Sequence, residues 1–148
     1  DGDSLNDIIT FFGNKGDIQI NTRLSTFDSS FEISGSENSD LLNEYNSIIR
    51  KYNLQNLDLL EIFYNAQIEN NQTRIDSVNS ELENLIRKKY LYTLNFSITN
   101  SANEISPYIA VSQIPDANDG LLRKLYDTLP DRIKDSKYGK ILKEITID

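Results

Sequence analysis

The sequence predicts an α+β fold in which short antiparallel strands, forming an incomplete sheet, precede a long αα-hairpin and short C-terminal helices. Two observations carry this prediction. Polarity alternates with a period of two in the first part of the chain, and apolar residues then recur at the helical spacing of three and four. With 148 residues the chain has about the length of one domain. We therefore expect a single domain over residues 1–148, with a β part in 1–35 and a helical part in 36–148.

Three β-prone runs come first: IITFFG (8–13), DIQINT (17–22) and FEIS (31–34). The glycines of GNKG (13–16) are typical of a hairpin turn. The first run is apolar on both faces and belongs inside a sheet, yet only a polar, turn-like segment precedes it. We expect the sheet edge to be completed by missing upstream strands or by a protein partner. Coverage of this edge by the helical hairpin is the alternative.

A long apolar stripe at helical spacing follows the last strand. Its members are Leu41, Tyr45, Ile48, Tyr52, Leu59 and Phe63, flanked by Leu42, Ile49, Leu60 and Tyr64. Either Ser36 or Ser39 can cap the start of this helix. Residues 53–56 (NLQN) predict a weak point at which the helix bends or breaks.

A second stripe predicts the other helix of the hairpin. It consists of Ile75, Val78, Leu82, Leu85, Tyr92 and Phe96. The polar turn ENNQT (69–73) separates the two stripes, and Thr73 with Asp76 approximates a capping box. Because the stripes are wider than a coiled-coil seam, we expect the hairpin to pack on a third layer. Leu82 and Leu85 should be buried against the first long helix.

The stretch ANEISPYIAVSQIPDA (102–117) predicts a short buried helix. Ser106 is a good N-cap, and Pro107 suits the first helical position because its missing N–H costs nothing there. Pro115 disfavours helix at Ile114 and ends the element. A further helix runs through GLLRKLYDTL, and a last one, KYGKILKEI, can be capped by Ser136.

Two motifs in this region resemble ligand loops and do not qualify. Counted from Asp116, DANDG places glycine at the fifth position and Asp127 at the twelfth, whereas a calcium-binding EF-hand needs glycine at the sixth and glutamate at the twelfth. It predicts a helix start instead. SKYGK (136–140) lacks the preceding glycines of a phosphate-binding loop. Gly139 is better explained as a small residue where helices approach closely.

The composition excludes several function classes. The chain has no cysteine and no histidine, which removes disulfides, thiolate nucleophiles, serine–histidine triads and most zinc sites. Its net charge of −8 disfavours nucleic acid as a partner. No apolar run is long enough for a transmembrane segment. We expect no catalytic residue, cofactor or metal, and no enzymatic activity. Because methionine is absent even at position 1, we expect the chain to be part of a larger protein.

From about residue 10 to 145 the chain resembles a domain family of unknown function from cell-envelope proteins of the Bacteroidota. The matching segments are FFGNKGDIQI, GSENSDLLNEY, SPYIAVSQI and LPDRIKDSKYGKIL. The resemblance implies a periplasmic or outer-membrane-anchored lipoprotein with a lipid anchor upstream. Family members commonly precede a thioredoxin-like or peroxiredoxin-type domain. This sequence lacks the family's first strands and the thioredoxin-like half, and the family offers no catalytic residue at these positions.

The resemblance leads to three hypotheses of function. The leading one is a non-catalytic accessory or interaction domain of the cell envelope. The second is a regulatory or substrate-positioning domain in front of a thiol-disulfide oxidoreductase. The third is a structural subunit of an outer-membrane-associated assembly. A C-x-x-C motif downstream in the full-length gene would support the second hypothesis.

Bacteroidota also O-glycosylate envelope proteins at an Asp followed by Ser or Thr and a small or apolar residue. The tripeptides DSL (3–5), DSV (76–78) and DTL (127–129) fit this pattern. They predict Ser4, Ser77 and Thr128 as acceptor residues. The alternative is that these residues serve ordinary caps and turns.

Overall fold

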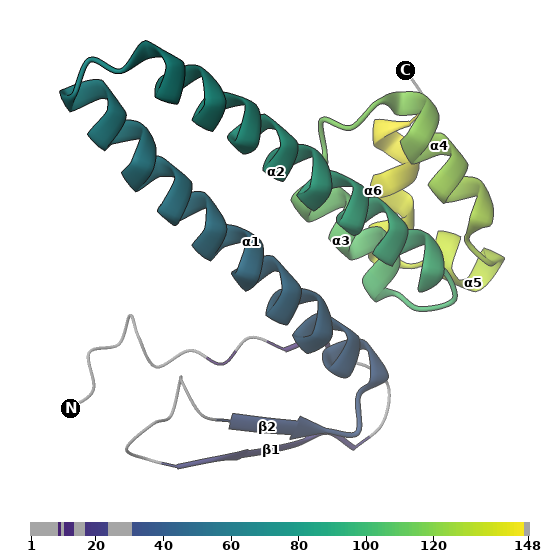
Figure 1. The fold of residues 1–148 in the computed structure, drawn as a ribbon. Helices are drawn as coiled ribbons and strands as arrows, with labels where there is room; N and C mark the ends of the chain where they lie inside the picture. Colours follow the sequence, from purple (N-terminus) through teal and green to yellow (C-terminus); the bar gives the residue numbers. More distant parts are fainter. Residues whose placement is uncertain (1–8, 10, 14–16, 24–30, 147–148) are drawn as a thin grey trace. The chain divides into compact units, whose positions relative to one another are not determined.

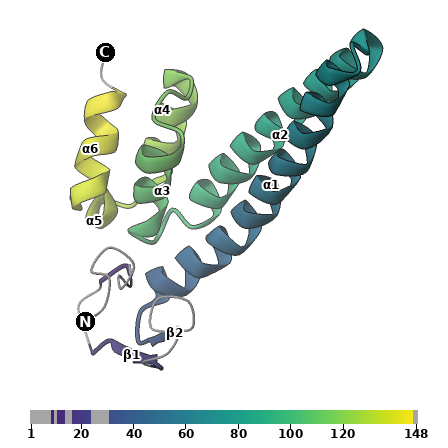
Figure 2. The same ribbon diagram turned by 90° about the vertical axis from the view of Figure 1, so that its left-hand side faces the viewer.

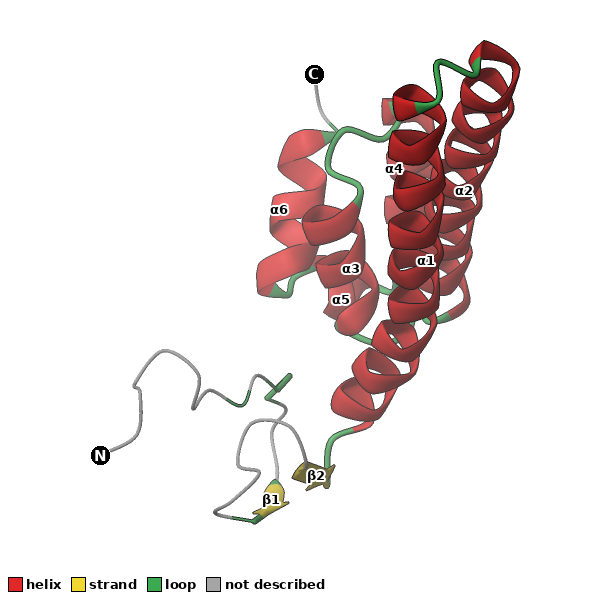
Figure 3. Ribbon diagram, turned by 60° about the vertical axis from the view of Figure 1, so that its left-hand side comes forward, coloured by secondary structure: helices red, strands yellow, loops and turns green. Residues whose placement is uncertain are grey.

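The fold is a mostly helical α+β structure, as the sequence predicts (Figures 1 and 3). The computed structural model describes residues 9, 11–13, 17–23 and 31–146. The elements in this part of the chain are β1 (Gln19–Thr22), β2 (Phe31–Ser34), α1 (Glu37–Ile68), α2 (Gln72–Thr99), α3 (Ile105–Gln113), α4 (Asp119–Thr128), α5 (Asp131–Lys134) and α6 (Lys137–Ile145). The chain divides into two compact units, Asp1–Tyr45 and Asn46–Asp148, with the boundary inside α1.

The sheet of the described residues has two strands. β1 and β2 pair antiparallel, with Ile20 opposite Ile33. They are joined to α1 through Gly35, whose φ of 86° and close approach to the Asp17 carbonyl leave no room for a side chain: a Cβ there would lie 2.2 Å from that oxygen. The strand expected over residues 17–22 begins two residues later, and the strand expected over 31–34 has the predicted bounds.

The expected strand over residues 8–13 is not observed, because residues 9 and 11–13, which the structure describes, are not in a strand. Hydroxyl groups at the start of α1 bind the backbone of Phe12 instead. Its N–H donates to Ser39 Oγ (3.1 Å), and its carbonyl oxygen accepts from Ser36 Oγ (2.8 Å) and Ser39 Oγ (3.1 Å). These bonds replace the ladder that a strand would need. Residues 14–16 of the expected hairpin turn lie outside the described residues.

The helix α1 starts where the sequence predicts and continues without a break. Ser36 caps it, since its Oγ accepts from the Ser39 N–H at 3.2 Å. The weak point predicted at residues 53–56 was wrong: all four are helical. Asn and Gln cost an exposed helix only a few tenths of a kcal/mol each, which is too little to interrupt it. The Asn53 side chain also accepts a hydrogen bond from Lys89 of α2.

The turn between α1 and α2 is a Schellman motif. Asn70 adopts a φ of 53°, the Asn70 N–H donates to the Gln67 carbonyl, and the Asn71 N–H donates to the Ala66 carbonyl. Asn71 then caps α2, because its Oδ1 accepts from the Arg74 N–H at 3.1 Å. The capping box predicted from Thr73 was therefore wrong. The helix starts one residue before Thr73, and an asparagine side chain already serves the first turn.

The main core lies among α2, α3, α4, α5 and α6, within the second unit (Figure 2). The C-terminal half of α2 packs against α3 and α4, and α6 packs against α3, α4 and α5. For α2, this is the third layer that the width of its apolar stripe predicts. Its buried members are Leu94, Ala110, Ile114, Ala117, Leu122, Leu125, Leu129, Ile133 and Leu142.

The short helix α3 ends where the sequence predicts, with Ile114 as its C-cap before Pro115, but it begins earlier. Ser106 is not its N-cap, because the helix starts at Ile105 and Glu104 precedes it. Ser106 is fully buried, and its hydroxyl donates to the Ser97 carbonyl of α2 at 2.7 Å. The hydroxyl thus ties α3 to α2 rather than capping its own helix.

The last helices confirm two sequence predictions. Asn118 caps α4 and Ser136 caps α6, so DANDG is a helix start and Ser136 serves as predicted. Gly139 lies where α6 approaches the backbone of α5: an added Cβ would lie 2.0 Å from the Ile133 carbonyl oxygen. The close helix approach expected for Gly139 is thereby confirmed.

Candidate binding surface on the helical hairpin

In the second unit, α1 and α2 run antiparallel as the two arms of a hairpin (Figures 1 and 2). The arms touch through side chains. The rings of Tyr52 and Tyr92 lie 6.1 Å apart, and Lys89 Nζ donates to Asn53 Oδ1 at 3.1 Å. These contacts place the arms close to each other beside the C-terminal core, where Tyr92 also contacts Phe96.

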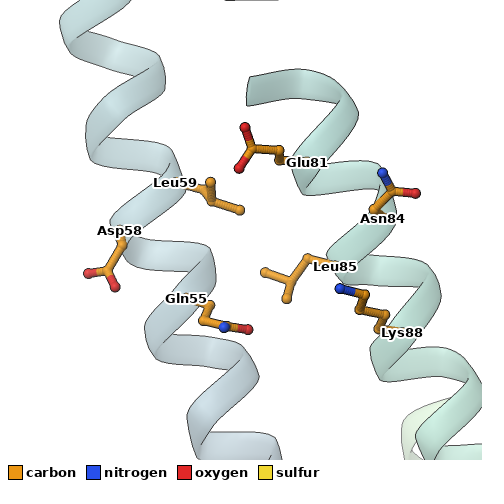
Figure 4. A pocket seen from close by; sticks show the side chains of 7 residues that line it. All are labelled: Gln55, Asp58, Leu59, Glu81, Asn84, Leu85 and Lys88. Atoms are coloured by element: carbon orange, nitrogen blue, oxygen red, sulfur yellow. The ribbon is translucent and has the colours of Figure 1, made fainter. Parts of the chain in front are cut away.

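Further along the hairpin an open groove separates the two helices. Its volume is about 330 Å³, and its lining residues are Gln55, Asp58, Leu59, Glu81, Asn84, Leu85 and Lys88. In Figure 4 the side chains of Leu59 and Leu85 point toward one another across the groove, whereas the Asp58 carboxylate points away from it. The groove therefore has a narrow apolar floor and polar walls.

The prediction for the seam of the hairpin is confirmed for Leu85 and only partly for Leu82. Leu85 is buried and faces Leu59, while Leu82 is half-buried. Leu85 lines the groove opposite Leu59, whereas Leu82 is not among the residues that line it.

The far face of α1 carries an apolar row that the seam does not use. Its members have high relative solvent accessibilities: 62% for Leu54, 61% for Leu57, 60% for Tyr64 and 79% for Ile68. Their spacing of three, seven and four residues places them on one face of the helix, with Glu61 at the position between Leu57 and Tyr64. We call these four residues the outer row. Large apolar side chains gathered on one exposed face mark interaction surfaces.

Charged side chains flank the outer row in two pairs of opposite sign. Arg50 and Lys51 lie before it along α1, and Asp58 and Glu61 lie within it; all four are exposed. None of the four forms an ion pair with another described residue. No opposite charge stands three or four residues from any of them on α1, so the helix itself does not neutralise them.

The predicted glycosylation residues do not form a common site. Ser77 is exposed near the start of α2, and Thr128 is exposed as the last residue of α4, where its hydroxyl donates to the Leu125 carbonyl. Ser4 lies outside the described residues. Modification of the three residues stays a prediction.

Sequence reasoning missed most of the outer row. The apolar stripe that the sequence predicts for the first helix includes Tyr64, which lies on the exposed face instead. The stripe does not include Leu54, Leu57 or Ile68. The signal that finds them is a second apolar periodicity in the same helix, offset from the stripe that faces α2.

Within the described ranges, no group of three or more acidic side chains could hold a metal ion. None of the described helices combines the length and the apolar character needed to cross a membrane. Comparison with protein-family models, with curated proteins and with solved structures gives no match to this chain.

Proposed function

We propose that this chain is a non-catalytic interaction domain of the cell envelope, belonging to a lipoprotein, and that the hairpin arm α1 is its binding element. The observation that carries the proposal is the outer row. Four large apolar side chains, each at least 60% exposed, follow one face of a helix whose other face serves the hairpin. A monomer gains nothing from keeping such a row in water.

The partner of this surface is a protein, and a helix of that partner packs on α1. A row at this spacing presents ridges that fit the grooves of another helix. The chain's net charge of −8 opposes nucleic acid, and the row is interrupted by charged residues, unlike the broad apolar face of a membrane-surface helix. The envelope location rests on the resemblance of the segments FFGNKGDIQI and LPDRIKDSKYGKIL to the Bacteroidota family.

The proposal includes the sheet edge. In the described part of the chain β1 and β2 pair with each other alone, and a two-stranded ribbon is marginal in water. An upstream strand or a partner's strand extends it by main-chain hydrogen bonds. Hydrogen exchange checks this point: amides of residues 19–22 should exchange quickly in the isolated chain and slow down once the added strand is present. Slow exchange in the isolated monomer would contradict it.

Site-specific photo-crosslinking in producing cells tests the binding element. A photoreactive phenylalanine analogue at Leu57 should give a discrete covalent adduct with a protein in the envelope fraction. The same analogue at Glu83, an exposed position on α2, is the control. Replacing Leu54 and Tyr64 by Ser should remove the Leu57 adduct. An adduct equally strong at Glu83, or none at Leu57, would overturn the proposal.

A further inference from the structure

We infer that the partner of the outer row is a second copy of this chain, which pairs antiparallel through α1. This inference rests on the proposed function of α1 as a binding element and names its occupant. The argument starts from the order of charges along the helix. Two basic residues, Arg50 and Lys51, precede the leucines at 54 and 57, and two acidic residues follow.

A parallel pair of α1 helices would bring like charges together. Arg50 would meet Arg50, and Glu61 would meet Glu61, each without an opposite charge nearby. An antiparallel pair inverts one helix and therefore brings the basic end of each copy to the acidic end of the other. Electrostatic complementarity of this kind selects orientation and register more than it adds affinity.

One antiparallel register pairs the two leucines and all four charged residues at once. When Leu54 of one copy lies opposite Leu57 of the second copy, the two-fold axis falls between residues 55 and 56. Arg50 then lies opposite Glu61 of the second copy in the same central line. Lys51 of one copy and Asp58 of the second copy lie on the same flank of the contact. Each of these pairings occurs twice because of the symmetry.

The apolar part of this contact is central and continuous. Four leucines, Leu54 and Leu57 from each copy, surround the two-fold axis, and Tyr64 extends the contact at each end. The Asp58 carboxylate points away from the hairpin groove (Figure 4), so it is directed to the outer side of α1 rather than occupied by α2. The charge pairs close both ends of the leucine cluster, as in antiparallel coiled coils.

The contact is small, which places it among weak and transient interfaces. One face of residues 47–64 is about 27 Å long, and a contact limited to one helix per copy lies near or below the ~1,200 Å² of a stable interface. We therefore expect a reversible dimer with a dissociation constant of roughly 10–100 µM rather than an obligate dimer.

Charge exchange between two variants provides the test. Arg50→Glu with Lys51→Glu makes both ends of the face acidic, and Asp58→Lys with Glu61→Lys makes both ends basic. Sedimentation equilibrium should show that each variant alone dimerises at least tenfold more weakly than the unsubstituted chain. An equimolar mixture should form a heterodimer at least as tight as the original dimer, since every pairing in it is again opposite in sign.

Arg87→Glu with Lys88→Glu is the matched control. It replaces another exposed Arg-Lys pair, this time on α2, and changes the net charge by the same amount as Arg50→Glu with Lys51→Glu. It should leave the dissociation constant of the dimer within twofold of that of the unsubstituted chain, and circular dichroism should show equal helix content in all variants.

A chain that stays monomeric up to ~1 mM would overturn the inference. A mixture of the two variants that does not associate, or a control that weakens the dimer as much as they do, would overturn it as well. If the Leu57 crosslink then joins a different envelope protein, the proposed function stands without the second copy. If no adduct forms, both fail.

Discussion

Two buried serines in contact with each other differ in what their hydroxyl groups do. Ser106 Oγ donates to the Ser97 carbonyl oxygen at 2.7 Å, whereas Ser97 Oγ, also fully buried, has no hydrogen-bond partner among the described residues. A buried hydroxyl without a partner costs stability, and a buried hydroxyl that serves a helix-end carbonyl contributes to it. The two positions should therefore respond in opposite directions to the same substitution.

Ser97→Ala should raise the free energy of unfolding by about 0.5–1.5 kcal/mol, because it removes an unpaired buried hydroxyl and improves helix propensity. Ser106→Ala should lower it by about 1–2 kcal/mol, since the Ser97 carbonyl loses its donor. Urea unfolding followed by circular dichroism measures both. Ser112→Ala, at an exposed position on α3, is the control and should change little. Equal losses at Ser97 and Ser106 would contradict this assignment.

Gly139 and Gly120 test the close approach of α6 to α5. Both glycines donate their N–H to the residue that caps their helix. A Cβ at Gly139 would lie 2.0 Å from a backbone carbonyl oxygen, so Gly139→Ala should cost about 2–3 kcal/mol. At Gly120 the nearest atom is the end of the Asn118 side chain at 3.0 Å, so Gly120→Ala should stay within about 1 kcal/mol of the unsubstituted chain. Thermal unfolding distinguishes them, and similar melting temperatures would refute the contact.

At the scale of the elements, the sequence predicts the hairpin, its turn and the C-terminal helices because each has local signals. Polar turn residues, prolines and caps such as Ser36 and Ser136 act within a few residues of the chain. The strand expected at residues 8–13 failed for a non-local reason. Whether Phe12 joins a sheet depends on what binds its backbone, and the hydroxyls of Ser36 and Ser39 follow more than twenty residues later. Apolar periodicity does not report such partners.

The helix α2 faces a groove on one side and solvent on the other, and neighbouring residues report on each. Leu85 is buried at the groove floor, while Ile86 is 65% exposed. Leu85→Ala should lower the free energy of unfolding by about 2 kcal/mol, and Ile86→Ala should change it by less than about 0.5 kcal/mol. Urea unfolding of the two single variants measures the difference. Equal small effects would show that the two helices do not need each other at this level of the hairpin.

For the molecule as a whole, stability and binding are assigned to different residues. The buried cluster of α2 to α6 carries the fold of the second unit, whereas the outer row of α1 is exposed. The sequence alone does not separate these roles, because Leu54 and Leu57 are of the same residue type as the core leucines and recur at the same helical spacing. Only the placement of each face against its neighbours distinguishes a row that folds from a row that binds.

This division predicts how leucines in the two places respond. Leu125→Ala, at a fully buried position in α4, should cost about 3–4 kcal/mol. Leu54→Ser with Leu57→Ser should cost less than about 1 kcal/mol in a dilute, monomeric sample, from lost helix propensity alone. Urea unfolding at low micromolar concentration compares them. A large loss in the double variant would mean that the outer row stabilises the monomer, contrary to the role in binding that we propose for it.

The central claim is that the outer row of α1 binds a second copy of the chain. An amide correlation spectrum recorded over a dilution series of the ¹⁵N-labelled chain, from ~10 µM to ~1 mM, tests it residue by residue across the expected dissociation range. We predict that amide signals of residues 50–64 shift with concentration along a single binding curve, while those of α4 and α6 stay fixed. Spectra that do not change with concentration, or changes concentrated in α4 and α6, would contradict the claim.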